Sequence, residues 1–281
     1  MTDGLGRLDE LPRVRLAPDP TPLERLPNIE REIAGPRLYV KRDDTHPLAF
    51  GGNKVRQLEF YFGEAREQGA DSVLITGAVQ SNFCRLCAAF AARLGLECHI
   101  QMEDRVPSGD PLYRSSGNVL IERLLGATLH SYPDGEDEAG ADARLEEIAA
   151  GLRALGIDAP VLGVCVRRAA DLQQPRILAR CGEIAKLLGV ASPVTGADVQ
   201  VTDEFLAPGY GQLNPATREA IMTGASREAL MLDPVYSGKA MAGFLDRARK
   251  GTAEETLVFL HTGGTPAIFA YGNVLGEGFG W

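Results

Sequence analysis

The side chain best placed for chemistry is Lys54, in the segment FGGNKVRQLEF of residues 50–60. Two glycines and an asparagine precede it, and a helical pattern of apolar residues begins at it, so we expect Lys54 at or near a helix start. The positive end of the helix dipole and partial burial both favour a neutral amine, which can attack a carbonyl group. Taken alone, the segment fits a solvated lysine in a first helical turn more often than a nucleophile.

Two further segments have the strand–turn–helix character that gathers anions. TGAVQSN (76–82) closes a predicted strand and opens a helix, where backbone N–H groups and the helix dipole can bind a carboxylate. HTGGTP (261–266) has the same character and is a candidate phosphate loop, although it lacks the lysine of a Walker sequence. Ser81 or Asn82 would also serve as an ordinary helix N-cap, so both roles stay open at this point.

Two tyrosines stand beside turns that could face a ligand. LDPVYSGKAMAGF (232–244) places Tyr236 and Ser237 ahead of a predicted helix, and APGYGQLN (207–214) places Tyr210 between two glycines. Tyrosines in turns more often pack against the protein surface. These residues alone therefore do not indicate a ligand site, and other motifs are needed to support one.

The sequence does not favour a metal, redox or hydrolase site. Cys84 and Cys87 form a C-x-x-C pair, but they lie inside a predicted helix among small apolar residues, where packing is the expected role. The other cysteines and the four histidines lack metal-ligand spacing, and no G-x-S-x-G sequence occurs. Asp43 and Asp44 are adjacent and would project to opposite faces of a strand, which argues against a glycosidase pair. We expect no bound metal.

The composition is that of an ordinary globular chain. Of 281 residues, 44% are hydrophobic and 24% charged, and no apolar run approaches the roughly 20 residues that a membrane span needs. The net charge is −9 and the basic residues are scattered, which argues against a nucleic-acid partner. Five cysteines do not suit a disulfide scaffold, and the N-terminus has no signal-peptide core. We expect a cytoplasmic protein with no membrane partner.

The candidate residues must be positioned by a series of alternating elements. The expected strands are 38–44, 72–76, 97–102 and 127–132, and the expected helices are about 54–69, 81–94, 118–125 and 138–155. Glycines close most of these helices. Such an order is typical of parallel strands joined by right-handed crossovers.

The second half of the chain shows fewer strands. We expect a strand at 161–166, a helix at 176–189, and a strand, glycine turn and helix at 257–271. Residues 1–37 are rich in proline and are expected to form a wrapping arm. The sequence thus predicts an α/β fold with two lobes. The smaller lobe comprises residues 56–155, the larger comprises 1–55 with 156–281, and the active site lies between them.

Seven segments, taken together and in this order, resemble one enzyme family. They are KRDD, FGGNKVRQLEF, GAVQSN, SGNVLIERLLGA, APGYG, LDPVYSGKAMAG and HTGGTPAIFAY. From about residue 15 to residue 271, the chain resembles the D-cysteine desulfhydrase and 1-aminocyclopropane-1-carboxylate deaminase family. The resemblance implies the two-lobed tryptophan-synthase β-like architecture (fold type II) with parallel-sheet cores. It also implies pyridoxal 5'-phosphate as the cofactor and a homodimer as the assembly.

The resemblance implies which residues hold the cofactor. Lys54 would form the Schiff base with the cofactor aldehyde, and after displacement by substrate it would take the Cα proton. Asn82 would contact the ring hydroxyl. Ser237 and Thr262 would face the pyridine nitrogen.

The resemblance also implies a set of substrate contacts. Backbone N–H groups of the turn Gln80–Ser81–Asn82 would hold the substrate carboxylate, and Ser81 would relay protons to Lys54. Tyr236 would approach the substrate from the other lobe as a third catalytic residue, with Tyr210 nearby. Phe83 would contact the cofactor face or the substrate at a position where relatives often carry histidine or glutamine, so the substrate identity stays open.

The hydroxyl at residue 237 favours β-elimination over ring opening. Family members that open a cyclopropane ring resemble an acidic pattern at this position, whereas a hydroxyl leaves the pyridine nitrogen neutral and suits a better leaving group. We expect a lyase acting on a sulfur-containing amino acid such as D-cysteine or L-cysteate, giving pyruvate, ammonia and sulfide or sulfite. Deamination of 1-aminocyclopropane-1-carboxylate is the alternative.

The chain also departs from the family in length. It passes from Gly156 through IDAP directly to VLGVCV, so a segment that in the family carries a Gly/Ser-rich phosphate loop is expected to be missing near residues 156–161. One hypothesis is that the natural polypeptide contains this segment. If the loss is instead a true deletion, a non-catalytic relative that binds a small molecule becomes a further alternative.

Overall fold

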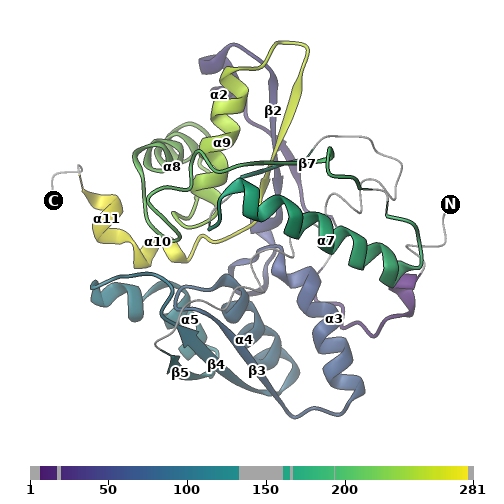
Figure 1. Cartoon of the computed structure of the whole chain (residues 1–281). Helices are drawn as coiled ribbons and strands as arrows, with labels where there is room; N and C mark the ends of the chain where they lie inside the picture. The colour runs from purple at the N-terminus through teal and green to yellow at the C-terminus, as the bar shows by residue number, and fades with distance from the viewer. Residues whose placement is uncertain (1–6, 18–19, 133–160, 165–166, 193, 278–281) are drawn as a thin grey trace.

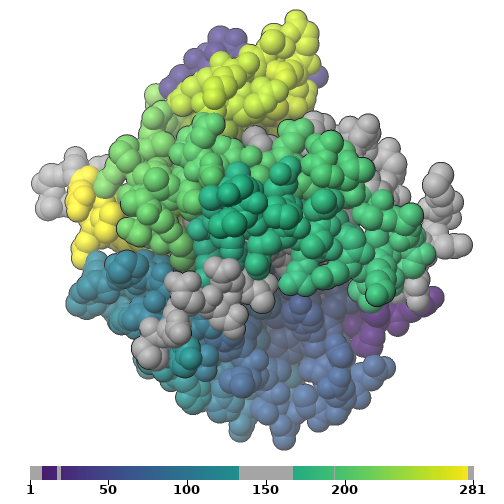
Figure 2. Space-filling view, in the orientation of Figure 1, coloured from purple at the N-terminus to yellow at the C-terminus, as the bar shows by residue number. Residues whose placement is uncertain are grey.

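The computed structural model describes residues 7–17, 20–132, 161–164, 167–192 and 194–277 (Figure 1). The predicted α/β fold with two lobes is confirmed. In the view of Figure 1, helices α3–α5 and strands β3–β5 form the lower lobe, and the upper lobe contains β2, α8 and α9. Figure 2 shows the same division in space-filling form, with the blue lower lobe beneath the green and yellow upper lobe.

The lower lobe is built on three parallel strands in the order β3–β4–β5. Its elements are α3 (Lys54–Glu67), β3 (Ser72–Ala78), α4 (Asn82–Leu94), β4 (Glu97–Glu103), α5 (Gly117–Leu124) and β5 (Thr128–Tyr132). These agree with the expected elements to within a few residues. The end of α4 was predicted correctly because Gly95 adopts a left-handed conformation, with φ of 74°, that ends the helix.

The core of the lower lobe lies between α3, α4 and the sheet. It contains Leu58 and Phe62 of α3, Leu86 and Phe90 of α4, and Ile100 of β4, all at most 2% exposed. Cys84, Cys87 and Cys98 are free thiols buried in the same core. The predicted packing role of the C-x-x-C pair is therefore confirmed.

The upper lobe contains two small sheets rather than one broad sheet. Strand β1 (Leu23–Arg25) pairs antiparallel with β2 (Arg37–Arg42), which pairs parallel with β8 (Thr256–His261). A separate parallel pair joins β6 (Val161–Val164) and β7 (Val199–Thr202). The scarcity of strands expected in this half is thus confirmed for the part of the chain that the structure describes.

Helices surround the first sheet of the upper lobe and complete its core. They include α2 (Pro27–Ile33), α8 (Pro215–Glu228) and α9 (Ser237–Arg249), followed after β8 by the short helices α10 (Ala267–Ala270) and α11 (Gly272–Gly276). Single-turn helices lie at Arg7–Glu10, Asp43–Thr45, Leu48–Phe50 and Pro111–Arg114. Leu38, Val40, Leu232 and Met241 are completely buried in this core.

Three parts of the upper lobe differ from the sequence-based expectation. Helix α7 (Ala170–Leu188) starts six residues before the expected position, because the carboxylate of Asp203 accepts the N–H of Ala170 at 2.8 Å and stabilises its first turn. Strand β7 and helix α8 were not expected. The expected strand 38–44 ends at Arg42, so Asp43 and Asp44 lie in a single-turn helix. The helix expected at 138–155 falls outside the described residues.

Only the first part of the arm expected over residues 1–37 packs on α3, since β1 and α2 belong to the upper lobe. Glu59 of α3 is completely buried and its carboxylate accepts from Arg13 Nε at 2.8 Å and from the backbone of Leu16 at 2.6 Å. A side chain at Gly63 would overlap the Pro12 carbonyl, with the Cβ only 2.3 Å from its oxygen. Within the described residues, every helix is too short or too polar to cross a lipid bilayer.

Candidate functional site

The two loops that carry Lys54 and Thr262 touch each other through their backbones. The N–H of Asn53 donates to the carbonyl of Thr262 at 3.2 Å. Gly263 has a φ of +96°, and a Cβ built on it would lie 2.7 Å from the Cα of Gly52. Only glycine permits this approach. Residues more than 200 positions apart in sequence are thereby brought to one place, where the end of β8 meets the start of α3.

Lys54 is the first residue of α3, as predicted, and its amine lies over an aromatic ring of the next helix. The Lys54 Nζ is 5.5 Å from the ring centroid of Phe83. Phe83 also makes an edge-on contact with Tyr61, with ring centroids 6.5 Å apart. Phe83, expected to contact the cofactor or the substrate, therefore lies against the candidate nucleophile.

At the turn before α4, some backbone N–H groups of the helix start already donate hydrogen bonds within the protein. Ser81 is the N-cap of α4, and its hydroxyl oxygen accepts the N–H of Cys84 at 3.2 Å. The N–H of Ser81 itself donates to the carbonyl of Ala78 at 2.9 Å. Because the first N–H groups of a helix have no acceptor within it, the donors suited to an anion here are those of Asn82 and Phe83.

The side chain of Gln80 binds the segment of residues 113–118 at the start of α5, inside the protein. Its amide nitrogen donates to the carbonyls of Tyr113 at 2.7 Å and Ser116 at 3.0 Å, and its oxygen accepts the N–H of Asn118 at 2.9 Å. Asn118 in turn donates to the side-chain oxygen of Asn82 at 3.2 Å. The Gln80 side chain is thus used within the protein, and the substrate contact expected of its backbone N–H stays a prediction. Asn118 is a partner of Asn82 that the sequence analysis missed.

The structure brings Tyr210 and Tyr236 together. Their hydroxyl groups share a hydrogen bond, and their ring centroids are 5.8 Å apart at 66°. Burial raises the pKa of both phenols, so each keeps its proton at neutral pH. The guanidinium of Arg167 lies 5.6 Å from the Tyr210 ring centroid. Two phenols and a cation therefore occupy one side of the candidate site.

Lys239 holds the loop that carries Tyr210. It is completely buried, and its amine donates to the carbonyls of Leu206 and Gly209, both at 2.7 Å. Burial lowers the pKa of this amine to about 8. The sequence analysis did not single out Lys239, because a lysine in a helix is usually solvated.

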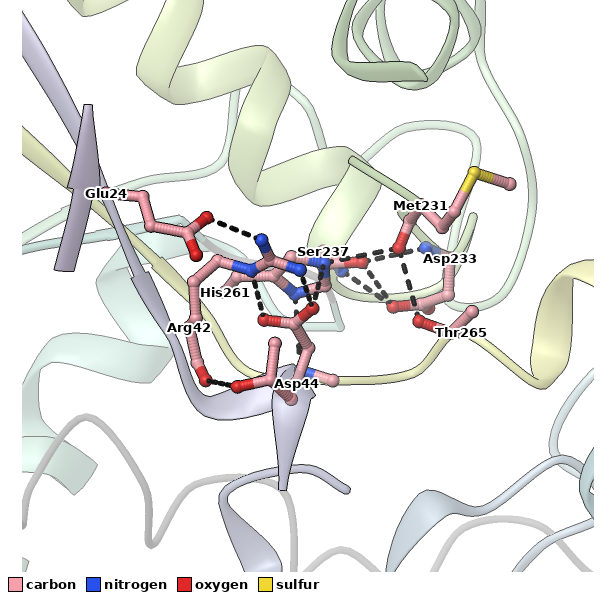
Figure 3. Close-up of polar contacts among 10 residues, drawn as sticks. Glu24, Arg42, Asp44, Met231, Asp233, Ser237, His261 and Thr265 are labelled. Carbon is pink, nitrogen blue, oxygen red and sulfur yellow. Dashed lines mark hydrogen bonds and ion pairs between the residues drawn. The ribbon is translucent and has the colours of Figure 1, made fainter. Parts of the chain in front are cut away.

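Ser237 is bound by a buried carboxylate at the start of α9 (Figure 3). Asp233 is completely buried, and its carboxylate accepts the backbone N–H groups of Val235, Tyr236 and Ser237 at 2.8–3.0 Å. The Ser237 hydroxyl donates to the same carboxylate at 2.6 Å and accepts the N–H of Asp233 at 2.8 Å. One lone pair of the Ser237 oxygen is left for a further donor.

Figure 3 also shows how the loop after β8 is fixed from the other side. The Nδ1 of His261 accepts the N–H of Gly263 at 3.3 Å, and its Nε2 lies 3.2 Å from the carbonyl oxygen of Met231. Burial lowers the pKa of His261, partly opposed by Asp44, whose carboxylate lies 3.7 Å away and pairs with Arg42. A neutral His261 therefore orients the loop that presents Thr262.

The predicted site residues thus gather at loops from both lobes, where α3, α4 and α9 begin and β8 ends. An amine, two asparagines, several hydroxyls and glycine loops at helix starts can hold a cofactor and a small anionic ligand. A family model described as pyridoxal-phosphate dependent enzyme matches residues 14–150. This match, to just under half of the chain, indicates the class of protein.

Closer relatives narrow the class. D-cysteine desulfhydrases of Salmonella schwarzengrund (strain CVM19633) and Salmonella newport (strain SL254) are 34% identical over 326 aligned positions, which take in 95% of this chain and 98% of the relatives. A crystal structure described as an ACC deaminase homologue superposes with a TM-score of 0.86 at 29% identity, covering 99% of both chains. The chain belongs to this family of pyridoxal-phosphate-dependent enzymes, and the predicted fold, cofactor and enzyme class are confirmed.

The alignment also bears on the length of the chain. Because 95% of 281 residues is about 267, about 59 of the 326 aligned positions have no residue of this chain opposite them. The family model ends at residue 150, before the point where the sequence predicts a loss. The location of the missing segment near 156–161 stays a prediction, since it lies outside the described residues.

Proposed function

We propose that this chain catalyses β-elimination from a sulfur-containing amino acid, with D-cysteine as the first candidate and L-cysteate as its competitor. The products would be pyruvate, ammonia and sulfide or sulfite. The observation that carries the proposal is the 34% identity, over 95% of the chain, to proteins named D-cysteine desulfhydrases. The position of Lys54 at the junction of both lobes supports it.

The described residues fit the ring and aldehyde end of pyridoxal phosphate. Lys54 offers a primary amine at a helix start, Asn82 an amide, and Ser237 and Thr262 hydroxyl groups on loops that converge there. When bound, the cofactor supplies an electron sink for the bonds at the substrate Cα. The Ser237 hydroxyl donates to Asp233 in this structure, and the neutral ring nitrogen expected from a hydroxyl at residue 237 stays a prediction.

The protein's own residues supply the binding and proton-transfer steps. The N–H groups at the start of α4 would hold the substrate carboxylate beside Ser81. The Lys54 amine would take the Cα proton, with Ser81 as a relay. The electron pair of the Cα–H bond forms the Cα–Cβ double bond while the carbon–sulfur bond breaks and its pair leaves with sulfur, as hydrosulfide or sulfite. The hydroxyl of the Tyr210–Tyr236 pair whose proton is not used between the two rings can donate a hydrogen bond to the departing group.

Replacement of Lys54 tests the proposal. Lys54→Ala should abolish turnover, and borohydride treatment of the wild-type holoenzyme should leave a reduced pyridoxyl group on residue 54, detectable by peptide mass spectrometry. Lys250→Ala, at an exposed lysine paired with Asp246, should retain both properties. Wild-type activity in Lys54→Ala, or a label found on another lysine, would contradict the mechanism.

A panel of substrates separates the candidate reactions. D-cysteine and L-cysteate are each incubated with the holoenzyme, and pyruvate is measured with sulfide or sulfite. Release of 2-oxobutyrate from 1-aminocyclopropane-1-carboxylate would instead favour the deaminase alternative. The similarity to the structure described as an ACC deaminase homologue is the observation that supports this alternative.

A second candidate function is a non-catalytic relative that binds a small molecule. The observation that favours it is the set of about 59 aligned positions without a residue in this chain. Purified protein that stays colourless after addition of pyridoxal phosphate would support this candidate, whereas a yellow protein would support the enzyme. The homodimer and the cytoplasmic location stay predictions, to be tested by light scattering and by fractionation.

A further inference from the structure

The loop before Lys54 has an unusual backbone conformation. Four consecutive residues have positive φ angles, with values of 44° at Ala49, 67° at Phe50, 63° at Gly51 and 122° at Gly52. Glycine adopts such angles readily, but alanine and phenylalanine do not. Because Ala49 and Phe50 are held there, contacts from the rest of the protein must stabilise the loop.

Arg85 of α4 provides those contacts. Its side chain is completely buried, and its guanidinium donates one hydrogen bond to the carbonyl of Ala49 and another, at 2.9 Å, to the carbonyl of Gly51. The planar guanidinium can reach two carbonyl groups at once, which fixes their relative orientation. Both acceptors belong to the strained loop, so Arg85 stabilises this conformation specifically.

The same helix also contacts the lysine. Phe83 lies two residues before Arg85, and its ring is 5.5 Å from the Lys54 Nζ. The loop continues from Gly52 to Asn53, whose N–H is bound to the Thr262 carbonyl, and then to Lys54. Helix α4 therefore sets both the backbone that leads to the amine and the surface beneath it.

Stability alone explains this arrangement poorly. Burying a guanidinium is costly, and the Arg85 Nε has no hydrogen-bond partner among the residues that the structure describes. Glu122 acts on Arg85 electrostatically, but neither of its carboxylate oxygens accepts a hydrogen bond from any described residue. A strained loop held by a costly buried charge is typical of a place where geometry serves function.

We propose that Arg85 is a positioning residue that holds residues 49–52 in the conformation that places the Lys54 amine for attachment of pyridoxal phosphate. The inference rests on the proposed role of Lys54. Arg85 itself takes no part in the chemistry. Its loss would move the amine, so the effect should fall on covalent attachment and on kcat rather than on substrate KM.

The test compares Arg85→Met with wild type, with Lys239→Met as the matched control. Lys239 is another completely buried cation that donates to two carbonyls, but of the Tyr210 loop. After incubation with pyridoxal phosphate and borohydride, the labelled fraction at Lys54 should fall about tenfold or more in Arg85→Met. It should stay within about twofold of wild type in Lys239→Met. The kcat of Arg85→Met should fall with a KM close to that of wild type.

The conservative variant Arg85→Lys keeps the charge with a single donor group, and its labelling should lie between those of wild type and Arg85→Met. It also decides the question if Arg85→Met does not fold, as judged by circular dichroism. Wild-type labelling in whichever folded Arg85 variant is measured would overturn the inference. An equal loss in Lys239→Met would overturn it as well, because the effect would then be general. Absence of label at Lys54 in the wild type would instead refute the proposed function, and this inference would fall with it.

Discussion

Several buried charged side chains around the site bind backbone N–H or carbonyl groups rather than side chains of opposite charge. Asp233 accepts three N–H groups, Lys239 donates to two carbonyls, and Arg85 donates to two more. Each such residue fixes a loop with one side chain, at the cost of desolvating a charge. At the scale of the residue, the site is held by these anchors rather than by its own catalytic groups.

Asp233→Asn should destabilise the protein by about 2–3 kcal/mol, because an amide nitrogen would face backbone donors that now bind a carboxylate. The measurement is urea unfolding of the purified protein. The matched control is Asp246→Asn on α9. The Asp246 carboxylate pairs with the exposed Lys250 that follows this helix, so the change should alter stability by less than about 0.5 kcal/mol. Equal losses of unfolding free energy in the two variants would show that the buried hydrogen bonds of Asp233 add nothing to stability.

Glu122 should make stability fall as pH rises. Burial raises its pKa from 4.5 to about 9, partly opposed by Arg85. Between these two values Glu122 holds a proton in the folded protein that it has released in the unfolded chain. The stabilisation of the folded state by this proton is therefore complete below about pH 4.5 and is lost towards pH 9. The expected slope is about 1.4 kcal/mol per pH unit for one proton.

Glu122→Gln, which is uncharged at every pH, should lack this slope. The urea midpoints of wild type and variant are compared from about pH 5 to pH 8, where the linkage is expected. Buried His261 has a lowered pKa and therefore makes stability fall as pH decreases, but it does so in both proteins and cancels in the difference. Parallel curves for the two proteins would contradict a neutral Glu122.

At the scale of the elements, the site depends on close approaches between loops that connect different strands and helices. Gly263 and Gly52 pack backbone to backbone, and a Cβ on Gly117 would lie 2.6 Å from the Gln80 side-chain oxygen and 2.8 Å from the Pro266 carbonyl oxygen. These contacts join the end of β8 to the starts of α3 and α5. The relative placement of the two lobes near the site is therefore set by positions without a side chain.

Gly263→Ala should separate the two loops, since its Cβ would need to occupy space now held by Gly52 and its φ suits glycine. We expect a stability loss of about 1–3 kcal/mol and weaker binding of pyridoxal phosphate, measured by absorbance titration. Gly272→Ala is the control, because a Cβ there meets no atom within 4 Å. Unchanged cofactor binding in Gly263→Ala would show that this loop contact does not support the site.

At the scale of the whole molecule, the N-terminal arm joins the start of the chain to the lower lobe. Its attachment depends on Glu59, which binds Arg13 and the backbone of Leu16 and Ala17. The lobes also share an apolar contact, in which Val79 and Val119 pack in one cluster with Val235 and Tyr271. The elements around the site are therefore linked both by the polar contacts of Glu59 and by the apolar cluster between the lobes.

Glu59→Gln should loosen the arm and destabilise the protein by about 3 kcal/mol, because Arg13 would lose the carboxylate that it now pairs with. Trypsin should then cleave faster after Arg13 and Arg15, which mass spectrometry of the first fragments would detect. Glu64→Gln, at an exposed position of the same helix, should leave cleavage unchanged. Equal cleavage rates in wild type and Glu59→Gln would refute this role.

Much of the lower lobe could be predicted because its signals are local. Apolar periodicity and glycine ends placed α3, α4 and β3–β5 to within a few residues. The early start of α7 was missed because the Asp203 carboxylate that caps it lies 33 positions away in the chain. Strand β7 was missed since it pairs only with β6, in a sheet of two strands.

The sequence by itself determined the family, the class of fold and the residues that could react, because the order of motifs and the local periodicity can be recognised without knowing which residues are in contact. Only the tertiary structure decided how those residues are held. Arg85 contacts a loop 36 positions away, Gln80 binds the carbonyl of Ser116, and Asp233 accepts a hydrogen bond from the Ser237 hydroxyl. These roles depend on distances between segments that fold together, and burial turns ordinary charged residues into anchors.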